Sequence, residues 1–334
     1  MLKKLALVAL VASAAVTSVF AADKINGAGA TFPAPLYYDW AFNYKNETKN
    51  SVNYQSIGSG GGIKQISKRV VDFGATDEAL STPALAKDNL YQFPAVIGSI
   101  VVAFNLPGIP DEKLKLKNSV VADIFAGKIT SWNDPAIVED NKDLNLPNKP
   151  ITTVHRSDGS GTTFNFTYFL SKVSKNWADS YGSSKSIDWA NGIGGKGNEG
   201  VTNMIKQTPY SVGYIESAYK EKNNLSAAVL QTQSGKWVTA TEENFKAAAK
   251  YAAWTKEQHF FSVLALQPGD TSYPIVAATY IVLPREGAAT NKKVTAFFDY
   301  AFKNGDEAAK KLGYIPLPED TKKMIREYWA ANIK

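Results

Sequence analysis

The stretch 51-SVNYQSIGSGGGIKQISKRV-70 decides how this chain folds, because it joins two regular patterns through a loop that has almost no side chains. Residues 51–57 have the composition of a strand, and residues 63–70 have apolar positions at helical spacing. We therefore predict a strand, a glycine-rich loop at 58–62 and a helix. The five small residues of this loop fill no core, so the junction calls for a functional explanation.

The same alternation of strand-like and helix-like segments continues on both sides of this junction and predicts an α/β fold. Residues 151–175 repeat the order of strand, tight polar loop and helix. Two long apolar runs, 95–108 and 273–284, have the pattern of buried strands. Further helices are predicted at 32–48, 118–128, 291–305 and 318–334. The 334 residues are enough for two domains, since a single core stops growing at roughly 250–300 residues.

The composition excludes several kinds of protein. The chain has no cysteine, which excludes disulfides, thiolate metal sites, thiol catalysis and a lipid-anchoring cysteine. Its two histidines, His155 and His259, cannot make a three-histidine zinc site, and we expect neither a metal nor a cofactor. The net charge of +6 is mild and the arginines do not cluster, so nucleic acid is not expected as a partner.

Residues 1–21 have the pattern of a cleavable signal peptide. Two lysines precede the almost wholly apolar run 5–16, and "VFA" at 19–21 suits a signal peptidase. The apolar run is short for a membrane span, and no later segment of the sequence is a better candidate. We therefore predict secretion, with cleavage near Ala21 or Ala22.

Three junctions place glycine together with serine or threonine at the start of a predicted helix. They contribute Thr31 with Phe32, then Ser59, and then Ser160 with Gly161 and Thr162. The first N–H groups of a helix lack partners and carry partial positive charge, and glycine lets an anion approach them. Serine and threonine are also ordinary N-caps, but three such junctions in one chain favour an oxyanion site.

Three charged residues lie in or near these loops. Arg156 can hold a tetrahedral oxyanion with two hydrogen bonds from its guanidinium, and Asp158 is placed to orient it. Asp77 would repel a bound anion unless that anion carries a proton to donate. The alternatives are a surface ion pair for Arg156 and Asp158, and a turn or cap aspartate for Asp77.

Catalysis has little support in the sequence. "DGSGT" at 158–162 differs from the G-x-S-x-G elbow of hydrolases, since Asp158 occupies a position that requires glycine. The glycine-rich segments 58–62 and 194–200 do not fit the pattern G-x-x-x-x-G-K-[ST] of a nucleotide-binding loop. Two alternatives remain open: a secreted phosphatase with Ser160 as its nucleophile, and a binder of another oxyanion such as sulfate or molybdate.

Seven motifs, which follow one another from about residue 26 to the C-terminus, carry a resemblance to a known family. They are "GAGATFPAPLY", "NYQSIGSGGGIKQI", "VDFGATD", "QFPAVIGSIVVAFN", "RSDGSGTTF", "GIGGKGNEGV" and "SVGYIESAY". Together they resemble the periplasmic phosphate-binding proteins of high-affinity phosphate ABC transporters. The resemblance implies two α/β lobes joined by a hinge, with dehydrated phosphate between them. It also implies delivery of phosphate to an inner-membrane permease, no enzymatic activity and no metal or cofactor, and we expect a periplasmic monomer.

The resemblance further implies which residues contact the phosphate. They are Ala30 through its backbone, and Thr31, Phe32, Ser59, Asp77, Arg156, Ser160, Gly161 and Thr162. Asp77 would accept the proton of the anion, and Asp158 would orient Arg156. His155 stands where the commonest members of the family have a second arginine, and 255–270 is the least family-like segment.

The same resemblance divides the chain into lobes. Lobe I would take residues 24–101 and 273–334, and lobe II would take 102–272. The chain would then pass between the lobes in the apolar segments 99–105 and 273–280.

Overall fold

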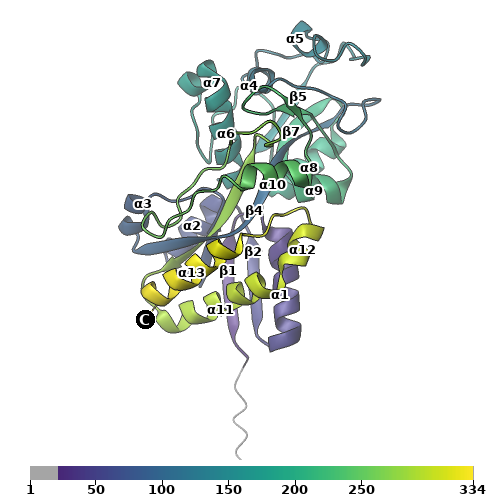
Figure 1. Ribbon diagram of the computed structural model, residues 1–334. Helices are drawn as coiled ribbons and strands as arrows, with labels where there is room; N and C mark the ends of the chain where they lie inside the picture. The colour runs from purple at the N-terminus through teal and green to yellow at the C-terminus, as the bar shows by residue number, and fades with distance from the viewer. Residues whose placement is uncertain (1–21, 334) are drawn as a thin grey trace, which may run out of the picture.

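The structure is a computed structural model, and it describes residues 22–333 of the chain. The predicted signal peptide at 1–21 lies outside the described residues. Between residues 22 and 333, no helix is both long and apolar enough to cross a membrane. The ribbon in Figure 1 shows two parts, and the N-terminal strands lie with the C-terminal helices in the lower one.

Nine strands form one sheet that runs through both parts. The strands of the structure are β1 (Lys24–Gly29), β2 (Ser51–Ser56), β3 (Phe73–Thr76), β4 (Leu90–Asn105), β5 (Thr152–Arg156), β6 (Ile193–Gly195), β7 (Ser211–Glu216), β8 (Ser226–Ala227), β9 (Leu230–Gln231), β10 (Trp237–Val238) and β11 (Val276–Pro284). The order in the sheet is β2-β1-β3-β11-β4-β7-β5-β6, and β8 pairs with β4. The strands β9 and β10 pair separately.

The sheet has two halves that are built alike. In the first half β1 pairs in parallel with β2 and β3, and in the second half β5 pairs in parallel with β6 and β7. The antiparallel strands β11 and β4 lie between these two sets of three. Because parallel strands end at the same edge of a sheet, the loops after the three strands of each half lie together.

The strand β4 links the two halves. Its residues 90–99 pair with β11, and its residues 100–105 pair with β7. The predicted passage of the chain at 99–105 therefore lies in this strand. The strand β11 pairs with β3 and with 90–99 of β4, and just before it Ile275 O accepts from Ile100 N–H at 2.8 Å.

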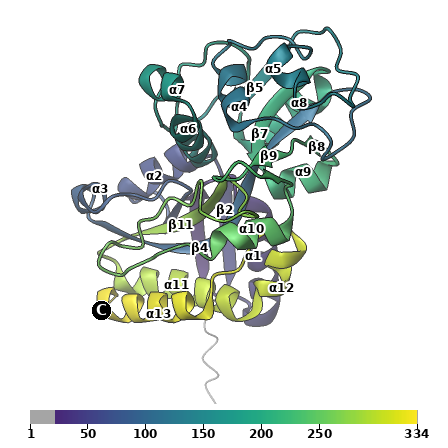
Figure 2. The same cartoon turned by 45° about the horizontal axis from the view of Figure 1, so that its top comes forward.

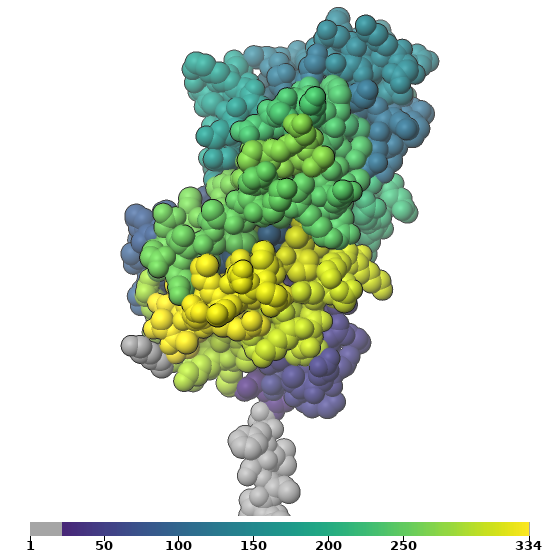
Figure 3. Space-filling model, viewed as in Figure 1, coloured from purple at the N-terminus to yellow at the C-terminus, as the bar shows by residue number. Residues whose placement is uncertain are grey.

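Helices surround both halves of the sheet. They are α1 (Ala34–Thr48), α2 (Ser59–Ser67), α3 (Thr82–Lys87), α4 (Asn118–Phe125), α5 (Pro135–Val138), α6 (Gly161–Val173), α7 (Lys175–Ser180), α8 (Gly197–Gln207), α9 (Ser217–Asn223), α10 (Glu242–Ala249), α11 (Ala288–Asn304), α12 (Asp306–Lys311) and α13 (Glu319–Asn332). Figure 2 shows α4 to α9 around the second half. Figure 3 shows the molecule from the same side as Figure 1. On this side the chain from α10 onward covers most of the middle and lower part of the surface.

Two clusters of buried side chains show that helices cover both faces of the first half. The small cluster contains Ala28 of β1, Ile66 of α2 and Leu85 of α3. The large cluster contains Ile25 of β1 with residues of α1 and α11, and it continues into the second half. Since Ile25 and Ala28 differ by an odd number of positions, their side chains point to opposite faces of the strand.

The predicted α/β fold, the strand at 51–57 and the helix after it are confirmed, but the predicted loop at 58–62 is wrong in its extent: α2 begins at Ser59 and ends at Ser67, so residues 59–62 form its first turn and only Ile57 and Gly58 connect it to β2. The strand β1 was not predicted from the sequence, because its residues KINGAG are rich in glycine. The structure explains both glycines by close packing. A Cβ on Gly27 would overlap the ring of Phe73, and a Cβ on Gly29 would overlap the backbone of Ala75.

Candidate anion-binding site

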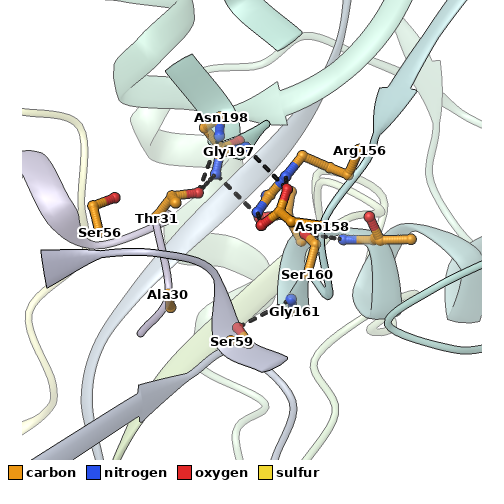
Figure 4. A network of polar contacts seen from close by, with 12 residues as sticks. Ala30, Thr31, Ser56, Ser59, Arg156, Asp158, Ser160, Gly161, Gly197 and Asn198 are labelled. Atoms are coloured by element: carbon orange, nitrogen blue, oxygen red, sulfur yellow. Dashed lines mark hydrogen bonds and ion pairs between the residues drawn. The ribbon is translucent and has the colours of Figure 1, made fainter. Parts of the chain in front are cut away.

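The loops that follow the parallel strands of the two halves meet and form the candidate site. Figure 4 shows Thr31 and Ser59 of the first half facing Arg156 and Gly161 of the second half. The predicted contact residues follow the ends of β1, β2 and β3 in the first half and of β5 in the second half. The structure therefore brings together residues that are up to about 130 positions apart in the sequence, as a cleft between sheet edges requires.

Ser59 is the first residue of α2 and joins the two halves. Its Oγ accepts hydrogen bonds from Asp77 N–H at 3.2 Å and from Gly161 N–H at 3.0 Å. A Cβ on Gly161 would lie 2.6 Å from this Oγ, which is too close for any side chain. In the same turn, Gly60 N–H donates to Gly159 O of the second half at 2.8 Å. The small residues 58–62, of which 59–62 form the first turn of α2, thus let the starts of α2 and α6 approach one another.

Asp77 is a buried carboxylate with an unpaired oxygen. Only 3% of the residue is exposed, and its Oδ1 accepts no hydrogen bond from any residue between 22 and 333. Its Oδ2 lies 3.5 Å from Ser59 Oγ, which is a long contact. Burial raises the pKa of Asp77 to about 7, although the nearby hydroxyl of Thr279, the charge of Arg156 and the hydroxyl of Ser59 act to lower it. The hydroxyl of Thr279 lies close to the carboxylate, but its hydrogen bond in this structure is a long one to Thr76 O at 3.5 Å, so Oδ1 stays without a donor. The unpaired oxygen is an acceptor that a ligand with a hydrogen to donate can satisfy.

Arg156 supplies the positive charge of the site, and only 4% of it is exposed. Its Nε and Nη2 donate to the two carboxylate oxygens of Asp158 at 2.8 and 2.6 Å. Its Nη1 lies 3.4 Å from Thr162 Oγ1. Burial raises the pKa of Asp158, but the hydrogen bonds and the charge of Arg156, together with backbone N–H groups such as that of Gly197, outweigh this effect and keep that pKa below its usual value. Asp158 therefore fixes one edge of the guanidinium and leaves other N–H groups for an anion.

The start of α6 contributes Ser160, Gly161 and Thr162. Ser160 Oγ accepts from Thr163 N–H at 3.0 Å, which is an ordinary N-cap bond. The N–H of Thr162 donates to no residue that the structure describes, so it can donate to a ligand. Because Ser160 Oγ already accepts this bond, its hydroxyl hydrogen is the group that it can offer to a ligand.

No histidine contacts Ser160 in the part of the chain that the structure describes. The Nδ1 of His155 lies 3.1 Å from Arg156 O, and its ring stacks on Trp189. The Nδ1 of His259 contacts the hydroxyl of Tyr328. A serine nucleophile needs an adjacent base, and neither histidine supplies one.

The loop after β1 brings Ala30, Thr31 and Phe32 to the site. Ala30 N–H donates to Ala75 O at 2.9 Å, and Ala30 O accepts from the hydroxyl of Tyr54 at 2.6 Å. Both backbone groups of Ala30 are therefore engaged, and its contribution is to shape the loop. The N–H groups of Thr31 and Phe32 find no acceptor within residues 22–333.

A fourth junction of the same design lies between β6 and α8 and was not predicted as part of the site. It is the glycine-rich segment 194–200, which does not fit a nucleotide-binding loop. Gly197 N–H donates to Asp158 Oδ1 at 2.9 Å, and Asn198 N–H donates to Thr31 Oγ1 at 3.0 Å. The signal in the sequence is the same as at 58–62, namely glycines directly before a helical pattern.

A second buried acid, Glu216, ends β7 near the site. Its Oε1 accepts from the hydroxyl of Ser217 at 3.0 Å. Its Oε2 accepts from Ala218 N–H at 2.8 Å and lies 3.1 Å from the hydroxyl of Tyr314. Burial raises the pKa of Glu216 to about 8, although these hydrogen bonds act to lower it. Sequence patterns give no sign of this network, because its members come from separate segments.

Further contacts hold the two halves together at the rims of the site. Lys185 of the second half forms an ion pair with Glu78 of the first half. At another rim, the hydroxyl of Tyr219 donates to Thr31 O at 2.6 Å. The structure therefore describes a closed arrangement, in which both halves contact one another around the site.

Comparisons with known proteins agree with this architecture. Residues 14–304 match a family model described as a PBP superfamily domain. The chain is 49% identical over 315 residues to the phosphate-binding protein PstS of Haemophilus influenzae, with 94% of each chain covered. It is also 49% identical over 315 residues to the phosphate-binding protein PstS of Pasteurella multocida, with 94% of this chain and 92% of the relative covered.

The fold is also similar to that of a solved phosphate-binding protein from Stenotrophomonas maltophilia. The TM-score is 0.68 at 22% identity, and the match covers 92% of this chain and 94% of the other. At this level of identity the match concerns the fold alone.

Proposed function

This chain belongs to the family of PstS phosphate-binding proteins within the PBP superfamily, and we propose that it binds inorganic phosphate and delivers it to an ABC permease for import. It is a solute-binding protein and not an enzyme. The family membership agrees with the resemblance that the sequence motifs carry.

The observation that carries the proposal is a site with many donors and one buried, unpaired acceptor. Arg156 and the starts of the helices can donate to the oxygens of a tetrahedral anion. Asp77 Oδ1 can accept only from an anion that keeps a hydrogen. Near neutral pH phosphate keeps at least one proton and sulfate keeps none. The site therefore suits phosphate, because sulfate would leave two unsatisfied negative groups in contact.

We assign the phosphate contacts to residues on both sides of the site; most have a free donor or the free acceptor, whereas Gly161 N–H donates to Ser59 Oγ in this structure. In this proposal Asp77 accepts the proton of phosphate, Arg156 makes the charged contact, and Asp158 orients Arg156. The remaining contacts come from Thr31, Phe32, Ser59, Ser160, Gly161 and Thr162, while Ala30 shapes the loop.

A ligand enclosed by both halves must enter through an open form, so we propose that the lobes rotate about a hinge. Lobe I takes residues 24–101 and 273–334, and lobe II takes 102–272. We also propose that the protein is a periplasmic monomer without a lipid anchor, exported by the signal peptide at 1–21. Osmotic shock should then release it from the cells, and recovery only with the membranes would contradict this location.

Calorimetric titration of the purified, dialysed protein tests the function directly. We expect phosphate to bind with one site per chain, and arsenate to bind as well because it has nearly the same shape and protonation. At pH 9, where Asp77 is ionised, sulfate should bind far more weakly than phosphate. Binding of sulfate in preference to phosphate would overturn the proposed function.

A further inference from the structure

Asn198, the second residue of α8, contacts both halves of the site. Its Nδ2 donates to Thr31 Oγ1 at 2.8 Å and to Thr162 Oγ1 at 3.2 Å. Its Oδ1 accepts from Glu216 N–H at 2.9 Å. The residue is fully buried, so all of these contacts form away from solvent.

The orientation of this amide follows from its partners. The backbone N–H of Glu216 can only donate, and therefore Asn198 Oδ1 must face it. The two hydrogens on Nδ2 then point at the hydroxyl oxygens of Thr31 and Thr162. Flipping the amide would place two donors against one another at Glu216, so no alternative assignment fits the network.

These hydrogen bonds determine what the two hydroxyl groups can do. A hydroxyl has two acceptor positions and one hydrogen. Thr31 Oγ1 accepts from Asn198 twice, from its N–H and its Nδ2, and Thr162 Oγ1 accepts from Asn198 Nδ2 and from Arg156 Nη1. With the acceptor positions used, each hydroxyl keeps only its hydrogen for a ligand.

From this network we propose that Asn198 is a positioning residue, which turns the hydroxyl hydrogens of Thr31 and Thr162 toward the bound anion and couples that arrangement to closure of the lobes. The inference rests on the proposed function, since it concerns how the same site holds phosphate. Asn198 itself has no free hydrogen for the ligand, because both Nδ2 hydrogens and its N–H are already donated.

A double-mutant cycle between Asn198 and Thr31 tests this role by calorimetry with phosphate. We expect Asn198→Ala to weaken phosphate binding roughly 10- to 100-fold, the range for hydrogen bonds that hold a charged ligand. In a Thr31→Val background only the hydroxyl of Thr162 is left to orient, so the same change should cost clearly less than it does in the wild type. Full additivity of the two losses, or wild-type affinity in Asn198→Ala, would overturn the inference.

Asn165 provides the matched control, because it is also a buried amide in this site. Its Nδ2 donates to the carbonyls of Asp77 and Gly161 at 2.7 and 3.0 Å, and to no hydroxyl. The loss in Asn165→Ala should therefore add to that of Thr31→Val.

If Asn198→Ala does not fold, Asn198→Asp serves in its place, because it keeps the shape and the acceptor for Glu216 N–H. It should weaken phosphate binding more than 100-fold, since its carboxylate accepts the threonine hydrogens and repels the anion. Near wild-type binding by this folded variant would contradict the role of Asn198. Titration of the wild type separates the two proposals, because only failure of the wild type to bind phosphate overturns the function itself.

Discussion

Asp77 and Glu216 occupy equivalent places in the two halves of the sheet. Asp77 follows β3, and Glu216 ends β7, and each of these strands lies between a parallel partner and an antiparallel one. Both acids are buried, and burial raises the pKa of Asp77 to about 7 and that of Glu216 to about 8. Only their hydrogen bonds differ. Both oxygens of Glu216 have protein donors, Ser217 and Ala218. The hydroxyl of Tyr314, which donates to Phe32 O at 2.6 Å, lies 3.1 Å from Oε2. By contrast, Asp77 Oδ1 accepts from no residue within 22–333.

This difference shows which of the two acids is available to a ligand. Burial alone does not identify the acid that binds a ligand, since both carboxyl groups are buried and both have a raised pKa. An unpaired buried acceptor costs stability, and a protein that keeps one usually has a functional reason. We therefore assign the recognition of a proton to the first half, through Asp77, and the supply of positive charge to the second half, through Arg156.

The largest expected effect on selectivity comes from Asp77. In Asp77→Asn the amide can turn a donor toward sulfate, so at pH 9, where the carboxyl of the wild type is ionised, the phosphate-over-sulfate affinity ratio should fall by roughly 100-fold, about tenfold for each pH unit above the pKa of about 7. Glu216→Gln is the matched control and should keep the ratio, because the carboxylate of Glu216 is already paired. Calorimetric titration of both variants with both anions measures the ratio. If Asp77→Asn rejects sulfate as strongly as the wild type does, Asp77 is not the residue that recognises the proton.

A comparable effect on affinity is expected from the charge of the second half. Arg156→Ala should weaken phosphate binding by about 2–5 kcal/mol, because it leaves the carboxylate of Asp158 unpaired beside the anion. Arg156→Lys keeps the charge but loses the two-pronged geometry, and should cost about 1.5–3 kcal/mol. Arg69→Ala, which removes a surface ion pair with Glu286, is the control and should leave the affinity unchanged. Equal affinities of wild type and Arg156→Ala would exclude the arginine from the site.

A smaller effect should appear in the pH dependence of sulfate binding. Below a pH of about 7 Asp77 is protonated, because burial raises its pKa to that value, and a protonated Asp77 can donate to sulfate. Above that pH the acid must first take up a proton, so sulfate affinity should fall about tenfold per pH unit. In Asp77→Asn this slope should vanish. A wild-type slope of the opposite sign would show that Asp77 does not face the anion.

An effect of the same size per pH unit is expected on stability, in Glu216→Gln. Because the folded-state pKa of Glu216 is raised to about 8, its contribution to stability is greatest at low pH and is lost as pH rises toward 8. The free energy of unfolding of the wild type should therefore fall by up to about 1.4 kcal/mol per pH unit from this group. Glu216→Gln removes that term, and denaturant unfolding between pH 5 and 8 should show a shallower slope. An unchanged slope would mean that Glu216 titrates normally.

The sequence was sufficient to predict the junctions of the site, because glycine before a helical pattern is a local signal. It predicted the starts of α2 and α6 and the pairing of Arg156 with Asp158, which are two residues apart. It did not predict β1, since the glycines of KINGAG indicate a loop until Phe73 and Ala75 are seen packed against them.

The remaining parts of the site could not be predicted, because they depend on contacts between distant segments. Asn198 bonds to Thr31 across 167 positions, and Tyr314 contacts Glu216 across 98 positions. No local pattern distinguishes the unpaired Asp77 from the paired Glu216. That distinction exists only once both halves of the sheet are folded and closed on one another.

The central claim is that phosphate binding closes the two lobes onto each other. The first half supplies an acceptor for the proton of the anion, and the second half supplies the positive charge. Small-angle scattering of the dialysed protein measures this most directly, with saturating phosphate, with sulfate at the same concentration, and with neither. We expect the radius of gyration to fall with phosphate and to stay unchanged with sulfate. An unchanged curve at saturating phosphate, or equal contraction with both anions, would contradict the account.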